Sequence, residues 1–193
     1  MQAFFSKFGL IIECLFLMIG VPILMDQFFP IRYLLPAIWS IALYCYLIAR
    51  FWMHEEFTLN WGRAAVTAQA LGPILARFAI CALLMGLLTW YLKPELLFNF
   101  VRSKPAFWLL VMFLYPLLSV LPQEIIFRSF FFARYQPLFP KPVVMVAMSA
   151  IAFGFAHILF HNWVAPTLCL IGGWLFADTY QKHKSLLLVA LEH

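Results

Sequence analysis

The residues with the clearest chemical potential lie in the stretch Leu121–Tyr135, LPQEIIFRSFFFARY, which follows a long apolar run. Glu124 and Arg128 are four residues apart, so on a helix the carboxylate and the guanidinium share one face and can pair. Gln123 lies about 100° round the helix from Glu124 and points elsewhere. An unpaired acidic or arginine side chain in mid-membrane is unfavourable by roughly 2.5–3.5 kcal/mol. The pair is therefore either a structural contact between helices or a catalytic carboxylate held by its arginine.

Three histidines further along the chain, His157, His161 and His193, are the next candidates. His157 and His161 are four apart, so on a helix both imidazoles face the same way. The pair lacks the glutamate of the zinc motif H-E-x-x-H. The spacing alone is therefore a weak signal for zinc, and a site built from the three histidines and Glu124 stays an alternative. If the two residues belong to no such site, we expect His157 to be a hydrogen-bonded core histidine and His161 to lie at the membrane interface.

The composition is that of a protein that crosses a membrane several times. Of the 193 residues, 65% are hydrophobic and 11% are charged, and the mean hydropathy is +0.93. Soluble domains are nearer half apolar and a quarter charged. The net charge of +5 is dispersed, without the basic and aromatic interleaving that is typical of nucleic-acid binding. The four cysteines lie in apolar segments without C-x-x-C spacing, which argues against a disulfide framework and a four-thiolate zinc site.

We expect an all-α transmembrane bundle of about six to eight helices with a polar cavity inside the membrane. A spanning helix needs about 20 apolar residues. Such runs fall at 8–29, 33–53, 70–92, 106–121, 143–161 and 164–180, and a shorter one starts at Ser185. Pro122 either kinks the fourth run or begins a new helix over 123–135. Arg77, in the third run, is expected to extend toward the membrane interface.

Three motifs in this order resemble those of the CAAX-protease and bacteriocin-processing (CPBP, or Abi) family of intramembrane endopeptidases. The family's EExxxR motif corresponds to Gln123–Arg128, its FxxxH motif to Phe153–His157, and the histidine of its third motif to His193. The resemblance covers about Leu121–His193. It implies a helical bundle with a water-accessible cavity, in which a glutamate and the second-motif histidine activate water against a peptide carbonyl. The third-motif histidine and its Asn would stabilise the oxyanion.

Two positions depart from the family pattern. The first glutamate of EExxxR is Gln123 here, and an amide cannot act as a base. Either Glu124 takes over and Gln123 orients water or substrate, or the peptidase activity is lost. The Asn or Asp that follows the third-motif histidine by four residues has no counterpart, because the chain ends at His193. Leu-Glu-His also begins common expression tags, but the apolar run before it favours a native His193 in a truncated chain.

The chain is predicted to be one integral membrane domain over 1–193, with N-terminal helices over 1–105 and a CPBP-like catalytic core over 106–193. The core is expected to be truncated, because the run from Ser185 is too short to cross the bilayer. More basic residues are expected on the side of the membrane that holds the N-terminus than on the opposite side. This favours a cytoplasmic N-terminus, and we expect the membrane to be a bacterial inner membrane. The first apolar run is too long for a cleavable signal, so we interpret it as the first transmembrane helix.

We therefore predict an intramembrane endopeptidase without a cofactor, acting on a peptide or a lipidated, in some cases prenylated, protein. The predicted catalytic residues are Gln123, Glu124, Arg128, His157 and His193. The residues expected to contact substrate are Phe127, Phe153, His161 and Asn162. The alternative is a catalytically inactive relative that binds a peptide for self-immunity or scaffolding, which Gln123 favours. A solute transporter is disfavoured, because the N-terminal half carries few polar groups.

Overall fold

The computed structural model describes residues 7–53 and 59–193, and the regular structure of these residues is entirely helical, as predicted. The α-helices are α1 Lys7–Leu15, α2 Val21–Phe28, α3 Leu34–Trp52, α4 Ala68–Leu92, α5 Asn99–Ser103, α6 Pro105–Tyr115, α7 Leu121–Glu124, α8 Phe131–Arg134, α9 Pro142–Phe155, α10 Val164–His183 and α11 Leu186–Glu192. The π-helical segments are Phe16–Gly20, Pro116–Val120 and Ile125–Phe130, and the 3-10 turns are Ile31–Tyr33, Arg63–Ala65, Pro94–Leu96 and Ala156–Phe160.

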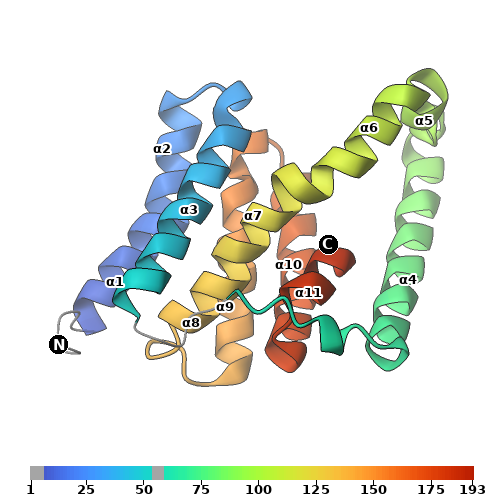
Figure 1. Ribbon diagram of the computed structural model, residues 1–193. Helices are drawn as coiled ribbons and strands as arrows, with labels where there is room; N and C mark the ends of the chain where they lie inside the picture. Colours follow the sequence, from blue (N-terminus) through green and yellow to red (C-terminus); the bar gives the residue numbers. More distant parts are fainter. Residues whose placement is uncertain (1–6, 54–58) are drawn as a thin grey trace.

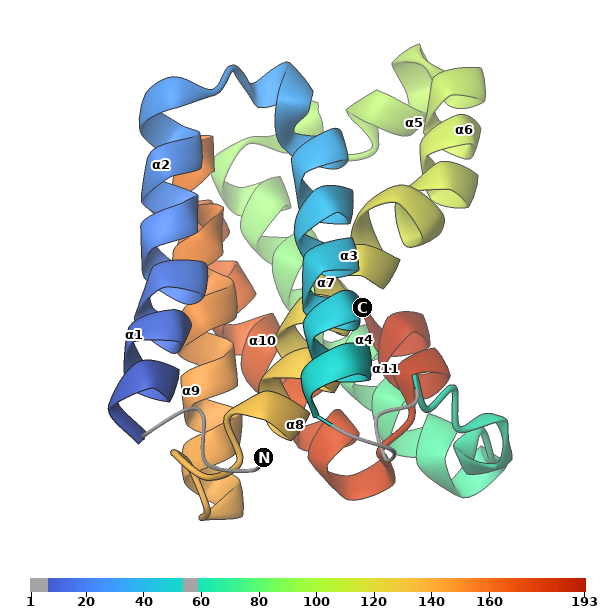
Figure 2. The same cartoon turned by 60° about the vertical axis from the view of Figure 1, so that its left-hand side comes forward.

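The helices form a bundle with one helix set apart from the rest. The continuous rod α1–α2 stands beside α3 and α9, α10 packs against α9, and the rod α6–α8 runs obliquely across the molecule (Figure 1). α4 stands at the far edge and is joined to α6 through α5 at one end (Figures 1 and 2). The short α11 contacts α4, α7 and α10. The end of the chain therefore lies within the bundle, between the oblique rod and α4.

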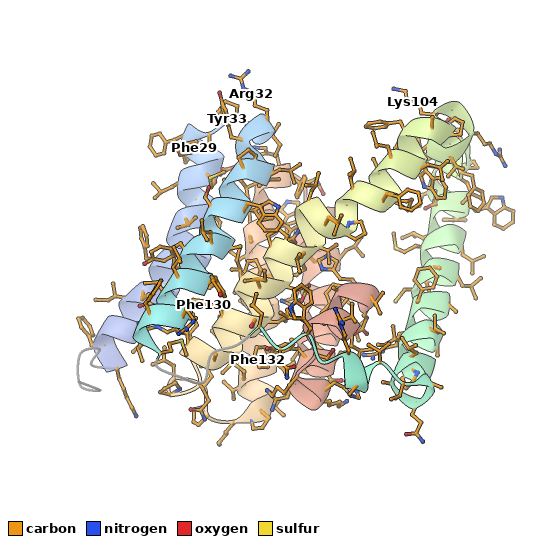
Figure 3. All side chains as sticks on the ribbon, in the orientation of Figure 1. Phe29, Arg32, Tyr33, Lys104, Phe130 and Phe132 are labelled. Atoms are coloured by element: carbon orange, nitrogen blue, oxygen red, sulfur yellow. The ribbon has the colours of Figure 1, made fainter. Side chains whose placement is uncertain are left out.

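Five of the helical rods are long and apolar enough to cross a membrane: Lys7–Phe28, Ile31–Phe51, Ala68–Leu92, Pro105–Arg134 and Pro142–Phe160. The sixth predicted span forms as α10 but is less apolar, because its last two turns carry several polar and charged side chains. Arg32 follows the first apolar run and Lys104 follows the third, so alternating spans place both on the same side of the membrane, and they lie at the same end of the molecule (Figure 3).

The helix that carries the Glu/Arg motif continues through Pro122, so no new helix begins there. π-helical segments lie before and after α7, which contains the proline. Pro122 has no N–H to donate to the carbonyl oxygen of Leu118, four residues earlier. The indole Nε1 of Trp39, from α3, donates to that oxygen over 3.1 Å. A side chain of the N-terminal half thus satisfies the backbone acceptor that the proline leaves without its helical donor.

An ion pair fixes the first rod to the end of the motif helix. Arg134 donates to both carboxylate oxygens of Glu13, over 2.9 and 2.7 Å, and the Tyr135 hydroxyl lies 3.3 Å from one of them. Arg134 is 9% exposed and the Glu13 side chain 14%. A two-point arginine–carboxylate contact at this burial fixes the relative rotation of the two helices as well as their distance.

Small residues let α9 and α10 approach closely. A Cβ added to Gly173 would lie 3.0 Å from the Phe153 ring and 3.3 Å from the Cα of Ala150. A Cβ added to Gly154 would lie 3.1 Å from both the Cα of Leu170 and the carbonyl oxygen of Pro166. Close helix contact through small residues is typical of membrane bundles. Here it seats Phe153, the first residue of the F-x-x-x-H motif, against α10.

The start of α11 is held by the loop before α4. Ser185 caps the helix by accepting from the Leu188 N–H over 3.1 Å, and its hydroxyl lies 3.0 Å from the carbonyl oxygens of both Trp61 and Gly62. The Leu186 N–H donates to the Asn60 carbonyl over 2.9 Å. This contact sets where α11 begins, and so where its last residues end.

Gly62 offers a direct test of this docking. Its φ is +53°, and an added Cβ would lie 2.5 Å from the Ser185 Cβ. We expect Gly62→Ala to destabilise the protein by at least about 1–2 kcal/mol from backbone strain alone, measured as thermal unfolding in detergent. Gly86→Ala is the matched control, because an added Cβ there meets no atom within 4 Å, and it should stabilise α4 by up to about 1 kcal/mol. Equal unfolding temperatures for the two variants would contradict this account of the loop.

Candidate active site

The predicted pair of Glu124 and Arg128 forms in the interior of the bundle. Glu124 ends α7 and Arg128 lies in the π-helical segment that follows, a local geometry that is frequent at functional sites. Arg128 Nε lies 3.2 Å from Glu124 Oε2, and neither side chain is exposed. The guanidinium carbon lies 4.8 Å from the ring centroid of Phe153 and 5.8 Å from that of Phe176. Two aromatic rings thus add cation–π stabilisation to a buried charge.

The second oxygen of Glu124 binds His193, which directly follows α11. His193 Nδ1 lies 2.7 Å from Glu124 Oε1. A carboxylate only accepts, so Nδ1 carries a proton and donates it. The imidazole stacks on Phe176 at a centroid distance of 4.6 Å and meets the Phe153 ring edge-on at 5.5 Å. Glu124 therefore faces Arg128 with one oxygen and His193 with the other, and it joins the first and third motifs.

His157 is held in one tautomer by its own helix. Its Nδ1 lies 2.7 Å from the carbonyl oxygen of Phe153, one turn earlier. Because a carbonyl oxygen only accepts, Nδ1 carries the proton, and Nε2 of the neutral ring keeps a lone pair. The interpretation of His157 as a hydrogen-bonded histidine is thus correct, but the ring also lines a cavity. A lone pair on an imidazole beside a cavity can accept a proton from a bound molecule.

Gln123 points away from Glu124, as its position on the helix predicts. Its Nε2 donates to the Ser119 hydroxyl over 2.8 Å. Its Oε1 is buried and has no hydrogen-bond partner among the described residues. Gln123 and His157 both line the same cavity. The amide of Gln123 and the imidazole of His157 therefore belong to the wall of one space.

That cavity has a volume of about 390 Å³ and is mainly apolar. Its polar groups come from the segments around the first two motifs, and much of its apolar wall comes from α2, α3 and the turn before α2. The N-terminal residues that line it include Leu17, Val21, Pro22, Met25, Ile38 and Ile41. A mostly apolar cavity with a few convergent polar groups is the usual form of a ligand site. The sequence predicts a polar cavity, whereas the observed one is mainly apolar, with polar side chains at Tyr115, Ser119, Gln123, His157 and Asn162.

The four residues expected to contact substrate divide into two groups. Phe127 and Asn162 line the cavity. Phe153 is 1% exposed and packs against His157 instead, with ring centroids 4.7 Å apart. His161 projects outward with its side chain 75% exposed, and its Nε2 lies 3.2 Å from the carboxylate of Asp26. Phe153 therefore supports the site from behind the cavity wall, and His161 joins α2 to the turn before α10.

The residues of the alternative zinc site do not form one cluster. His161 faces Asp26, while Glu124 is occupied by His193 and Arg128. Among residues 7–53 and 59–193, no three His, Cys, Asp or Glu side chains are grouped so that they could hold a metal ion. The residues present therefore do not fit a zinc ion in this arrangement.

Two contacts of the site were missed by sequence reasoning. Ser119 accepts from Gln123, and their four-residue spacing in one helix is a signal that could have indicated it. Arg77 does not simply extend toward the interface, because its Nη2 lies 3.1 Å from Glu192 Oε1 in α11. A contact between residues 115 positions apart leaves no local pattern in the sequence.

Comparison with protein families finds one relationship. The family model described as type II CAAX prenyl endopeptidase Rce1-like matches residues 105–193, which run from α6 to His193. The match covers less than half of the chain, and it includes all five residues predicted to be catalytic. Members of this family are intramembrane peptidases. No curated protein and no solved structure matches the chain. With its five apolar spans, the protein is an integral, multi-pass membrane protein.

Proposed function

We propose that the protein hydrolyses a peptide bond of a lipid-modified peptide within the membrane. The first reason is that residues 105–193 belong to the Rce1-like family of type II CAAX prenyl endopeptidases. The observation that carries the proposal is that Gln123 and His157 both line one mainly apolar cavity. An apolar space suits a hydrocarbon group, and the two polar groups at its wall suit a peptide bond and water. A prenyl group attached to the substrate is the occupant that the family description suggests.

In the proposed reaction, water donates one hydrogen bond to His157 Nε2 and the other to Gln123 Oε1. As the water oxygen bonds to the peptide carbonyl carbon, its proton passes to His157 Nε2. The tetrahedral intermediate then collapses, the C–N bond breaks, and His157 returns the proton to the leaving nitrogen. The products are a carboxylic acid and an amine, and His157 is regenerated as a neutral ring. The amide of Gln123 orients the water but takes no proton.

Glu124 has a different role in this proposal, although the sequence made it a candidate base. Its oxygens are directed at Arg128 and His193, and it has no exposed surface. It holds the His193 ring in one orientation, because its Oε1 accepts from His193 Nδ1 over 2.7 Å. As the histidine of the third motif, His193 is proposed to stabilise the developing oxyanion, where a donor has its largest effect in a dry site.

We further propose that the two halves of the chain have different roles in the reaction. The helices of residues 1–105 supply the apolar wall against which the lipid lies, and residues 106–193 supply the polar groups that act on the peptide bond. The bias of basic residues toward the N-terminal side supports a cytoplasmic N-terminus in a bacterial inner membrane.

A second candidate function is a binding protein that has lost the reaction. It is favoured by Gln123, because no carboxylate lines the cavity among the described residues. Such a protein would hold a lipidated peptide in the same cavity without hydrolysing it.

Cleavage of a fluorogenic prenylated peptide by purified protein in detergent tests both functions. We expect wild-type turnover, a fall of roughly 10- to 100-fold in Gln123→Leu because the attacking water loses its orientation, and no change with a chelator. Gln69→Leu makes the same chemical change at an exposed position of α4 and should match wild type. If the wild-type protein does not cleave the peptide but Gln123→Glu does, the wild-type protein is instead a binding protein with the fold of a protease. Loss with the chelator would identify a metal enzyme.

A further inference from the structure

Arg77 connects the otherwise peripheral helix α4 to the end of the active site. It is the sole charged residue of α4, Ala68–Leu92. Its Nη2 lies 3.1 Å from Glu192 Oε1 and donates to the Thr179 hydroxyl over 3.2 Å, while its Nε donates to the Pro73 carbonyl over 3.3 Å. The side chain thus bridges α4, α10 and α11.

The packing between α4 and α11 places Arg77 opposite Glu192. Ala70, Ile74 and Leu188 form a small buried cluster, separate from the main core. Ala70, Ile74 and Arg77 follow one another at helical spacing on one face of α4, and Leu188 and Glu192 do so on α11. The apolar contact seats the middle of α11, and the ion pair one turn further on seats its end.

The burial of Glu192 makes the ion pair consequential. Its side chain is 5% exposed, whereas that of Arg77 is 29% exposed. Arg77 is the cation paired with Glu192 among the described residues. Removing one partner of a buried pair leaves an uncompensated charge, which is more unfavourable than the pair itself. Without Arg77, the last turn of α11 would have to open for the Glu192 carboxylate to reach water.

Glu192 is adjacent to His193, so a movement of this turn moves the active site. The His193 N–H donates to the Val189 carbonyl over 2.9 Å and extends the helical hydrogen bonding of α11 to the end of the chain. The His193 ring reaches Glu124 over 2.7 Å. A bond of that length between two buried groups is lost with a displacement of about 1 Å, because hydrogen bonds weaken steeply beyond about 3.2 Å.

We propose that Arg77 is a positioning residue: through Glu192 it holds the last turn of α11 so that His193 meets Glu124. Its effect on turnover rests on the proposed function, whereas its effect on α11 does not. The residue lies outside the segment that matches the family, 105–193. The N-terminal half would then contribute to the geometry of the reacting groups as well as to the cavity wall.

Hydrogen exchange and kinetics on the purified protein in detergent test the proposal together. In Arg77→Met, we expect faster amide exchange over residues 189–193 and a kcat lower by roughly 10- to 100-fold, with KM within about twofold. Arg77→Lys should recover part of both, because it restores the charge but not the second contact to Thr179. Arg102→Met, at an exposed arginine of α5, is the matched control and should behave as wild type in both measurements.

The double variant Arg77→Met, Glu192→Gln separates positioning from general damage. With the buried charge gone, the turn no longer has to open, so exchange over 189–193 should return most of the way to the wild-type rate. Wild-type exchange in Arg77→Met would overturn the proposal, and so would equal exchange in the single and double variants. An inactive wild-type protein would refute the proposed function alone, because the exchange rates still decide whether Arg77 holds α11. If Arg77→Met fails to fold, Arg77→Lys and the double variant decide in the same way.

Discussion

Replacing His157 with alanine should lower the turnover of a prenylated peptide by roughly 10²- to 10⁴-fold, the usual contribution of a general base. Its Nδ1 is engaged by the Phe153 carbonyl at 2.7 Å, so the basic nitrogen is the one left to the cavity. The measurement is single-turnover cleavage in detergent. KM should change little, because the apolar wall that holds the lipid is untouched.

Two further variants show whether the loss of activity in His157→Ala comes from the missing base or from a structural change. His157→Gln has an amide N–H that can still donate to the Phe153 carbonyl but no basic nitrogen, so it should be as inactive as His157→Ala. His183→Ala removes an exposed histidine at the end of α10 and should retain full activity. Substantial turnover in His157→Gln would show that the histidine is structural and that another group accepts the proton.

Arg128→Met should destabilise the protein by roughly 3–5 kcal/mol, the usual penalty for leaving one charge of a buried pair alone. Neither Arg128 nor Glu124 is exposed, so water cannot replace the missing partner. Methionine keeps much of the apolar contact with Phe153 and Phe176, which limits the loss from packing. The measurement is thermal or denaturant-induced unfolding in detergent, with Arg102→Met as the exposed control.

The double variant Arg128→Met, Glu124→Gln isolates the electrostatic part. A neutral amide leaves no buried charge, so the double variant should be more stable than Arg128→Met alone, and the two substitutions should be strongly non-additive. Additive losses would contradict the account, because they would mean that the two side chains do not interact. Activity is not expected to return, because a neutral amide accepts a weaker hydrogen bond from His193 Nδ1 than the Glu124 carboxylate does.

Local pattern predicted the parts of the site that lie within one helix. The four-residue spacing of Glu124 and Arg128 predicts their contact, and the rotation of Gln123 away from Glu124 follows from the same geometry. Five of the six long apolar runs proved long and apolar enough to span the membrane. Residue periodicity is sufficient for these features, because each depends on neighbours within about one turn of the chain.

The remaining features depend on contacts between distant segments, which periodicity does not report. The partner of Glu124 is His193, 69 residues later, and the apolar wall of the cavity comes from helices that precede the motifs by about 100 residues. The outward turn of His161 follows from a left-handed backbone conformation, φ +51°, that ends its helix. Helical spacing alone had placed it on the same face as His157. The catalytic roles, the domain division and the absence of a cofactor stay predictions.

The ion pair between Glu13 and Arg134 has a consequence for how the protein is made. Synthesis proceeds from the N-terminus, so the first span leaves the ribosome 121 residues before the arginine that neutralises its carboxylate. Until then, an acidic side chain within the span weakens the insertion of that helix, by up to roughly 2.5–3.5 kcal/mol at the membrane centre and by less toward the interface. The first span stays apolar enough to cross the membrane, so we expect this penalty to weaken its insertion without preventing it. Once the motif helix is in place, Arg134 pairs with Glu13 and removes the penalty.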